Sequence, residues 1–318
     1  MKNFLVFGYG SIAKKHINII KKKVLKSKFY IIRKSKSNPL IKNLKFIKNL
    51  NSIKKTNFYA VLICSPTSNH FKNMRQISGL VNLIFIEKPL VNNIREFAKI
   101  CKISLKKKNI IIVGYVFRFN EAFKFVEKEI KKKKYGKVLN IESNYSSYLP
   151  TWRKKNYKKT VSYNKKLGGG VTNELSHDLD ILVKLFGKIR LKDVKSFNNS
   201  DLKSKVEERI FCFAEIKKKT PVFIKLSFNE KILNRHLFIN FSKGSIFWDI
   251  ISQKVQINYF KNKKDIKKNF LFKNSNSKMF ENQMDFLLSS KNKMYNNKFL
   301  NKEFETLKLI HEIKKKIK

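Results

Sequence analysis

The residues best suited to transfer a proton follow three consecutive glycines, Gly168 to Gly170. Apolar residues then recur every three or four positions, which predicts a helix with a core-facing stripe of Leu175, Leu179, Leu182 and Phe186. Asn173, His177 and Asp180 share another face of that helix at i, i+4 and i+7, with Glu174 beside them. A lone helical histidine is usually structural. One grouped with two carboxylates and an amide after a glycine-rich entry is a candidate for proton transfer.

A lysine in a distinctive setting is the second candidate. Lys88 stands between Glu87 and Pro89, directly after the apolar run Leu83 to Ile86. That run predicts a buried parallel strand, and ligands of open parallel sheets bind beyond the carboxyl ends of the strands. Most lysines of so basic a chain are simply solvated, but this one is expected to face a bound cofactor. Pro89 is a candidate cis proline that would aim the lysine inward.

The start of the chain carries a phosphate-binding turn. Gly8, Gly10 and Ala13 follow the short strand predicted over Phe4 to Phe7. Gly8 permits a tight turn, Gly10 allows a pyrophosphate to approach the backbone, and Ala13 lets the next helix pack closely while its positive N-terminus faces the phosphates. The spacing alone is a weak signal, strengthened by its place between a strand and an amphipathic segment. Residues 65–70 and 87–89 follow two further predicted strands, at the same ligand-binding edge of the sheet. The turn and these two segments together predict dinucleotide contacts from Gly8, Tyr9, Gly10, Ser11, Ile12, Ala13, Ser65, Pro66, Thr67, His70, Glu87 and Lys88.

The elements that must position these residues form two patterns. Up to about residue 118, buried strands alternate with crossover helices, which predicts a doubly wound α/β domain. The strands are expected over Phe4–Phe7, Phe29–Ile32, Ala60–Cys64, Leu83–Ile86 and Ile110–Val113, and the helices over His16–Val24, Phe71–Ile77 and Ile94–Leu105.

Beyond Asn120 the pattern changes to a helix, Glu121–Lys134, and then mostly strands. Those strands are expected over 137–149, 210–216, 222–228, 236–241, 245–250 and 255–260, in an antiparallel meander, with closing helices over 279–288 and 300–317. At 318 residues the chain exceeds one typical domain. We therefore expect domains at 1–119 and 120–318, the second an α+β domain with a largely antiparallel open sheet whose polar face needs a partner subunit.

The formal net charge of +50 raises the alternative of a polyanion-binding protein. Only 8 of the 72 basic residues are arginine, however, and the lysines are spread over the whole chain. Readers of nucleic acids rely on the planar guanidinium fork, so we expect no specific nucleic-acid partner. Three isolated cysteines indicate a reducing cytoplasm and no metal site, and no run approaches the ~18 apolar residues of a membrane span.

Five ordered segments together resemble the Gfo/Idh/MocA oxidoreductases. They are Gly8–Ala13, Ser65–His70, Glu87–Pro89, Gly114–Asn120 and Gly168–Asp180. The resemblance runs from residue 1 to about 190. It implies an N-terminal Rossmann domain, a C-terminal domain whose open sheet often mediates homodimers or homotetramers, and hydride transfer between a nicotinamide and a hydroxyl or keto group of a sugar, nucleotide sugar or polyol.

The resemblance also implies roles for single residues. Lys88 corresponds to the family's catalytic lysine, and His177 to its active-site histidine and our choice of general acid or base. The family's carboxylate stands four residues before that histidine, where this chain has Asn173, so Glu174 is the candidate substitute. This departure keeps open a second hypothesis, a dinucleotide-binding sensor or partner protein without turnover.

The cofactor and substrate leave further alternatives. Rossmann domains that prefer NAD usually carry an acidic residue after the second strand, where this chain has Arg33, with Lys34 and Ser35 beside it. A cation there accommodates a 2′-phosphate, so NADP is favoured over NAD.

Substrate contacts are expected from Arg118, Trp152, Arg153, Tyr157, Asn173 and His177. Trp152 could stack on a sugar or merely pack its loop, and Arg153 could pair with a carboxylate or phosphate. The loop around them resembles family members of surface-glycan and acidic-sugar biosynthesis.

Overall fold

The computed structural model of the protein describes residues 1–33, 41–53, 55–77, 79–153, 156–198, 201–261, 264–273, 276–290 and 298–317. The chain divides into two compact units. The first consists of Met1–Tyr115 and Ser277–Leu307, and the second of Val116–Asn276 and Lys308–Lys318. The expected division at 119/120 lies close to the first of these boundaries. It assigned residues 277–307 to the second domain, however, whereas they cluster with the first unit.

The first unit is built on a six-stranded parallel sheet in the order β3-β2-β1-β4-β5-β6. Its strands are β1 (Lys2–Phe7), β2 (Ser27–Ile32), β3 (Leu44–Ile47), β4 (Ala60–Ile63), β5 (Leu83–Ile86) and β6 (Ile110–Val113). The five predicted strands are all present. The short edge strand β3 was missed, because four residues of mixed polarity carry little periodic signal. The strand order reverses between β1 and β4, and this switch point is where ligands of such sheets bind.

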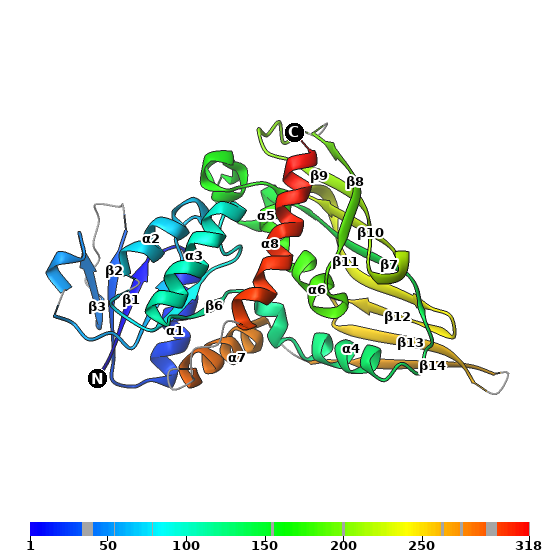
Figure 1. Ribbon diagram of the computed structural model, residues 1–318, viewed down its shortest axis with the longest axis horizontal. Helices are drawn as coiled ribbons and strands as arrows, with labels where there is room; N and C mark the ends of the chain where they lie inside the picture. Colours follow the sequence, from blue (N-terminus) through cyan, green and yellow to red (C-terminus); the bar gives the residue numbers. More distant parts are fainter. Residues whose placement is uncertain are drawn as a thin grey trace. The chain divides into compact units, whose positions relative to one another are not determined.

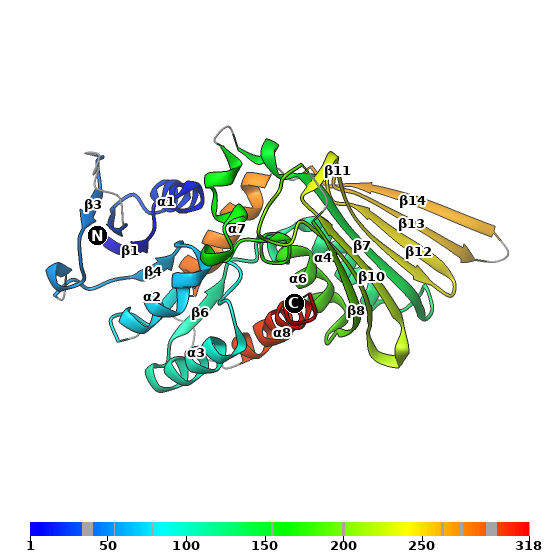
Figure 2. The ribbon, with the colours of Figure 1, turned by 90° about the horizontal axis from the view of Figure 1, so that it is seen from above.

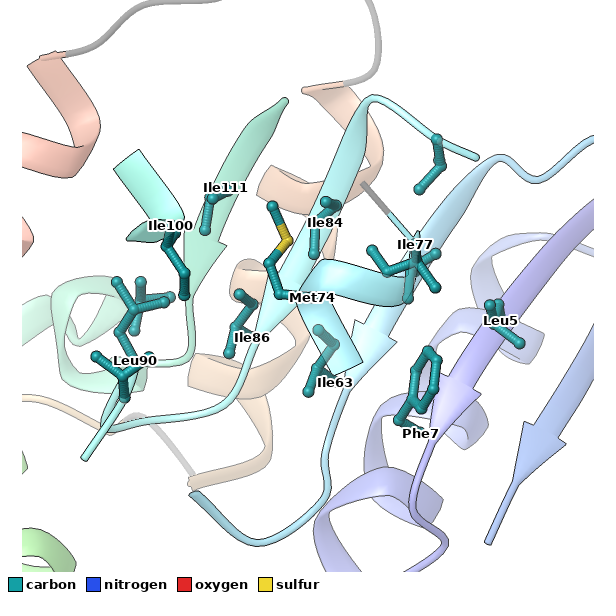
Figure 3. Close-up of a cluster of buried hydrophobic side chains, with 14 of the residues drawn as sticks. Leu5, Phe7, Ile63, Met74, Ile77, Ile84, Ile86, Leu90, Ile100 and Ile111 are labelled. Atoms are coloured by element: carbon teal, nitrogen blue, oxygen red, sulfur yellow. The ribbon is translucent and has the colours of Figure 1, made fainter. Parts of the chain in front are cut away.

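Helices cover both faces of this sheet, as the doubly wound prediction requires. Leu5 and Phe7 of β1 belong to the core beneath α2 (His70–Ile77) and α3 (Ile94–Lys107), which Figure 3 shows around Met74 and Ile100. Phe4 and Val6 point to the opposite core, beneath α1 (Ser11–Lys23) and α7 (Asn276–Ser289). Alternation along one buried strand therefore supplies both cores.

The late helix α7 joins the first unit because of its apolar side. Met284 and Leu287 are fully buried in the core that contains Ile17 and Ile20 of α1. Tyr59, next to β4, donates its hydroxyl to the carbonyl oxygen of Leu288 at 2.6 Å. Nothing local in the sequence of α7 says which of two cores will receive it, which is why the boundary prediction placed it with its sequence neighbours.

The second unit contains an eight-stranded sheet in the order β14-β13-β12-β11-β7-β10-β9-β8 (Figures 1 and 2). Its strands are β7 (Val138–Tyr148), β8 (Arg190–Phe197), β9 (Arg209–Glu215), β10 (Pro221–Ser227), β11 (Asn229–Phe241), β12 (Gly244–Asp249), β13 (Lys254–Lys261) and β14 (Lys264–Leu271). All neighbours are antiparallel except β7 and β10. The largely antiparallel open sheet is thus confirmed, while the lysine-rich β8 and β14 were missed.

One face of this sheet is covered and the other is open. On the covered face Phe123 of α4 (Glu121–Lys131) meets the buried Trp248 of β12, with ring centroids 6.4 Å apart. On the open face, Phe211, Phe213 and Phe223 are 40, 41 and 48% exposed. Outward phenylalanines on a sheet are unusual, since such faces are normally polar.

The helix predicted after the glycine triplet is interrupted. It forms as α5 (Val171–Glu174) and α6 (Ser176–Phe186), separated at Leu175. Asn173 and Glu174 therefore lie on a short turn before α6, whereas His177 and Asp180 lie on α6 itself. Among the described residues, no helix is both long enough and apolar enough to span a bilayer.

Candidate active site

The glycine turn has the geometry that a dinucleotide needs. Gly8 adopts φ +90°, and a Cβ atom there would lie 2.8 Å from the carbonyl oxygen of Cys64. A Cβ on Gly10 would meet no described atom within 4 Å. Gly10 is the N-cap of α1, and Ala13 is fully buried against the sheet. Gly8 is thus required for the backbone conformation of the turn, whereas Gly10 leaves open space at the positive end of helix α1.

The loop after β4 is held by α2. His70 is buried, with Nε2 2.8 Å from the Ser65 carbonyl oxygen and Nδ1 3.2 Å from the carbonyls of Pro89 and Leu90. Burial lowers the pKa of His70, against the opposing effect of these hydrogen bonds. Asn73 Nδ2 donates to Ser65 Oγ at 2.8 Å. His70 therefore joins the loops after β4 and β5, while Ser65 and Pro66 remain partly accessible.

The segment after β5 presents the lysine. The Lys88–Pro89 peptide bond is cis, as predicted. Glu87 Oε1 lies 2.7 Å from Nε2 of His16 on α1. Burial, and after it the negative charge of Glu87, raises the pKa of the Cys64 thiol at the end of β4. The ends of β1, β4 and β5 are adjacent in the sheet, so the three predicted loops meet at one edge.

The cation after β2 lies on an aromatic platform. The guanidinium carbon of Arg33 is 4.6 Å from the ring centre of Phe46 on β3 and 5.6 Å from that of Tyr9. The Tyr9 and Phe46 rings meet edge to face at 5.2 Å. This stacking holds Arg33 beside the glycine turn. Lys34 and Ser35, named with it, lie outside the described residues.

In the second unit the predicted proton-transfer residues lie on two successive elements, α5 and the first turns of α6. His177 is half-buried on α6, with its ring 5.5 Å from that of Phe117 in a T-shaped contact. Asn173 is buried and its Nδ2 donates to the Gly168 carbonyl at 2.7 Å. That donation suits an amide, since a carboxylate in the same place could not make it. Glu174 is half-buried on the same turn.

Two arginine–aspartate pairs hold α6. Of their two arginines, the sequence predicted a substrate contact only for Arg118. Arg118 donates Nε and Nη2 to the Asp180 carboxylate at 2.8 and 2.6 Å. Arg235 of β11 makes the same bidentate contact with Asp178 and was missed. Its only sequence signal was that arginine is rare in this lysine-rich chain. Arg118 is thus engaged with Asp180, and its role toward a substrate stays a prediction.

The loop ahead of the glycine triplet is partly packed. Trp152 donates Nε1 to Ser147 Oγ at 3.1 Å and its ring meets Phe228 edge-on at 5.2 Å. The Tyr157 ring contacts Tyr163 at 5.5 Å. Arg153 is exposed. These contacts favour the packing alternative for Trp152 while leaving part of its ring accessible.

The fold and these segments define a class of protein, and comparison with known families agrees. Residues 2–115 match the oxidoreductase family with an NAD-binding Rossmann fold, and residues 127–300 match the C-terminal α/β domain of the same family. The chain belongs to the Gfo/Idh/MocA oxidoreductase family.

Particular relatives are more distant. A segment of 131 residues is 29% identical to inositol 2-dehydrogenase of Rhizobium meliloti (strain 1021), covering 41% of this chain and 37% of that protein. The match thus spans well under half of that relative. Levoglucosan dehydrogenase in complex with NADH aligns with a TM-score of 0.83 at 13% identity, over 99% of this chain and 96% of that one. UDP-N-acetylglucosamine 3-dehydrogenase from Acidithiobacillus ferrooxidans gives 0.76 at 13% identity, over 99% and 97%. At such identities the structural likeness establishes the fold.

Proposed function

We propose that the protein is an NAD(P)-dependent oxidoreductase that moves a hydride between a nicotinamide and a hydroxyl or keto group of a sugar, nucleotide sugar or polyol. The observation that carries the proposal is the convergence of three loops at the switch point of the parallel sheet. Gly10 offers open space at a helix N-terminus, and Lys88 follows the strand β5 two places from β1. The N-terminus of α1 would hold the phosphates of a bound dinucleotide, and in this proposal Lys88 would act at the nicotinamide end.

The residues divide the proton chemistry between them. A bound nicotinamide supplies the hydride acceptor or donor. During oxidation of a secondary alcohol, the hydroxyl proton must leave as the carbon loses its hydride. His177 accepts that proton, and Lys88 donates a hydrogen bond to the same oxygen, which stabilises its developing charge. In the reduction His177 returns a proton to the oxygen, while Lys88 donates the same hydrogen bond to it.

Cofactor binding and turnover test this proposal separately. Thermal unfolding is measured with NAD, NADH, NADP and NADPH, and at least one should stabilise the protein, since binding to the folded state raises its melting temperature. Sugars, nucleotide sugars and polyols are then screened by nicotinamide absorbance. Lys88→Met and His177→Ala should each lower kcat at least about 100-fold. Lys102→Met on the exposed face of α3 and His236→Ala on β11 are matched controls. No stabilisation by any of the four nucleotides would refute the proposal.

The proposed cofactor preference is NADP over NAD. The support is the place of Arg33, stacked on Phe46 and beside the glycine turn where the adenosine ribose of a bound dinucleotide would lie. A guanidinium can pair bidentately with a 2′-phosphate, whereas it offers nothing specific to a 2′-hydroxyl.

Arg33→Ala isolates this preference. We expect it to weaken NADPH binding by roughly 10- to 100-fold, the value of hydrogen bonds to a charged group, and to change NADH binding by less than about threefold. Arg75→Ala, an exposed arginine at the far end of α2, removes the same charge elsewhere in the unit. An equal loss for both nucleotides would argue against recognition of the 2′-phosphate.

The missing carboxylate leaves a second candidate function, a dinucleotide-binding sensor without turnover. The observation that favours it is the amide of Asn173, whose Nδ2 is committed to the Gly168 carbonyl. In the catalytic proposal Glu174 replaces the carboxylate, so Glu174→Gln should lower kcat about 10-fold or more without changing cofactor affinity. Cofactor stabilisation without turnover on any screened substrate would support the sensor instead.

We further propose an acidic or nucleotide-linked sugar as substrate. The exposed Arg153 could pair with a carboxylate or phosphate, and Trp152 and Tyr157 line the same loop. One solved relative of the fold is named for a UDP-sugar and others for levoglucosan, which frames the substrate screen. Arg153→Ala should raise KM for an anionic sugar by about 10-fold while a neutral polyol is unaffected.

Self-association through the open face of the second sheet is the last part of the proposal. Phe213 and Phe223 contact each other there at 5.4 Å between ring centres. A second subunit would remove these rings from water, which is worth about 25 cal/mol for each Å² buried. The double variant Phe213→Ser/Phe223→Ser should sediment as a monomer, whereas Leu25→Ser, which changes an 89% exposed side chain of the first unit, should not.

We also propose a cytoplasmic location, with which the three free cysteines are consistent.

A further inference from the structure

His16 of α1 is a buried histidine whose position the proposed chemistry leaves unexplained. Its side chain is fully buried, five residues after the helix begins. Its ring contacts Phe85 of β5 at 5.0 Å and Phe280 of α7 at 5.9 Å, so neighbours on two sides fix its orientation. Its Nε2 atom lies 2.7 Å from Glu87 Oε1, directly ahead of Lys88. A polar link thus joins the phosphate-facing helix to the lysine loop.

The proton of this link can be assigned from what surrounds the ring. No described residue accepts a hydrogen bond from Nδ1, which is buried. A proton on Nδ1 would therefore be an unsatisfied buried donor, which is costly. The arrangement that avoids it is a neutral ring that carries its single proton on Nε2 and donates it to the carboxylate of Glu87.

The carboxylate of Glu87 is held from other directions as well. Oε2 lies 3.2 Å from the backbone nitrogen of Lys88, which donates to it. A Cβ atom on Gly114, just after β6, would lie 2.8 Å from that same oxygen. The Gly114 backbone in turn donates to the carbonyl of Ile86 at 2.8 Å. Glu87 therefore has little freedom to move, and a displacement of it would carry the backbone of Lys88 along.

We propose that His16 is a positioning residue: its Nε2–H bond to Glu87 fixes the backbone at Lys88 relative to helix α1. The inference rests on the proposed function, because it assumes that the N-terminus of α1 holds the cofactor's phosphates and that Lys88 acts on the reacting oxygen. The His16–Glu87 hydrogen bond then contributes to the position of the Lys88 backbone relative to that helix. Misplacement by about 1 Å can cost on the order of 100-fold in rate, whereas the contacts that bind the cofactor stay intact.

A graded pair of variants tests this role. In His16→Gln the amide nitrogen can replace Nε2 and still donate to Glu87, whereas His16→Met has similar length and no donor. We expect His16→Met to lower kcat by about 10- to 100-fold with KM for the cofactor within about threefold, and His16→Gln to recover most of that loss. Asn18→Met on the exposed side of the same helix is the matched control. Equal kcat in wild type and His16→Met would overturn the proposal.

A measurement independent of activity keeps the inference separate from the proposed function. Nitrogen NMR of the wild-type protein distinguishes the two neutral tautomers and the imidazolium of His16. We expect Nε2–H with an unprotonated Nδ1 at neutral pH; a proton on Nδ1 would overturn the assignment even if His16→Met fails to fold. If the wild-type protein binds none of the four nucleotides, the proposed function is refuted. The NMR measurement still tests the position of the proton on His16 independently of that outcome.

Discussion

Arg235 of β11 and Asp178 of α6 form a buried bidentate ion pair, with Nε and Nη2 donating to the two carboxylate oxygens at 3.0 and 2.8 Å. The guanidinium carbon lies 4.1 Å from the ring centre of Phe117 and 4.3 Å from that of Tyr145. Phe117 in turn contacts His177, the neighbour of Asp178. Arg235 thus contacts both Asp178, the chain neighbour of His177, and Phe117, the ring that packs against His177.

Removing one member of this pair should be more damaging than removing both. Asp178→Leu leaves a buried guanidinium without its counter-charge, and we expect a loss of about 3–5 kcal/mol in unfolding free energy. The double variant Asp178→Leu with Arg235→Met replaces the charges by apolar groups and should recover most of that loss. Chemical denaturation of the single and double variants checks this, and additive losses would contradict the coupling.

Three glycine-to-alanine variants should separate folding from cofactor binding. Gly8→Ala places a Cβ at φ +90° against the Cys64 carbonyl and should destabilise the protein by about 1–3 kcal/mol. Gly10→Ala meets no described atom, so we expect unchanged stability without cofactor but weaker dinucleotide binding. Gly79→Ala, also in open space, should change neither. Melting curves with and without nucleotide measure both the stability and the dinucleotide binding of each variant. Dinucleotide binding that is unchanged in Gly10→Ala would contradict a phosphate site at this turn.

The unfolding free energy should decrease as the pH is lowered through the range in which His70 titrates. Burial lowers the pKa of His70 from its ordinary value of 6.5, so the unfolded chain takes up the proton more readily than the folded protein. The contribution of neutral His70 to the unfolding free energy is complete above pH 6.5. It is lost as the pH falls toward the lower pKa that His70 has in the folded protein. We expect a loss of at most about 1.4 kcal/mol per pH unit in that range.

Urea unfolding at several pH values measures this dependence, with His70→Gln as the reference that lacks the titrating group. The difference in unfolding free energy between wild type and variant should shrink as the pH falls below 6.5. A difference that stays constant or grows would show that His70 is not held in its neutral form.

The indole of Trp152 should contribute to stability through its loop contacts. Trp152→Phe removes the hydrogen bond to Ser147 and should cost about 0.5–1.5 kcal/mol. Ser147→Ala removes the acceptor and keeps the ring against Phe228, so it should cost a similar amount. Should both variants keep full stability while KM for a sugar substrate rises, the ring serves the substrate rather than the packing.

Much of the local structure around the candidate site could be predicted because its signals are local. The strand, glycine turn and helix at residues 4–20, and the strand followed by Glu87, Lys88 and a cis Pro89, depend on neighbours only a few residues apart. The helix after Gly170 was also predicted, but its interruption at Leu175 was not. Asn173, on the turn before the break, bonds back to Gly168, and periodic apolar spacing carries no information on such a side-chain bond.

The sequence by itself thus determined the parallel sheet of the first unit, the largely antiparallel sheet of the second, and the order of the loops at the switch point. Only the tertiary structure decided which distant groups meet. His16 and Glu87 are 71 positions apart, Asp178 and Arg235 are 57 apart, and α7 joins a core begun by the first strand. The reason is physical: hydrogen-bonded turns and side-chain periodicity act over a few residues, whereas partners of buried charges and apolar helix faces are chosen by packing of the whole chain.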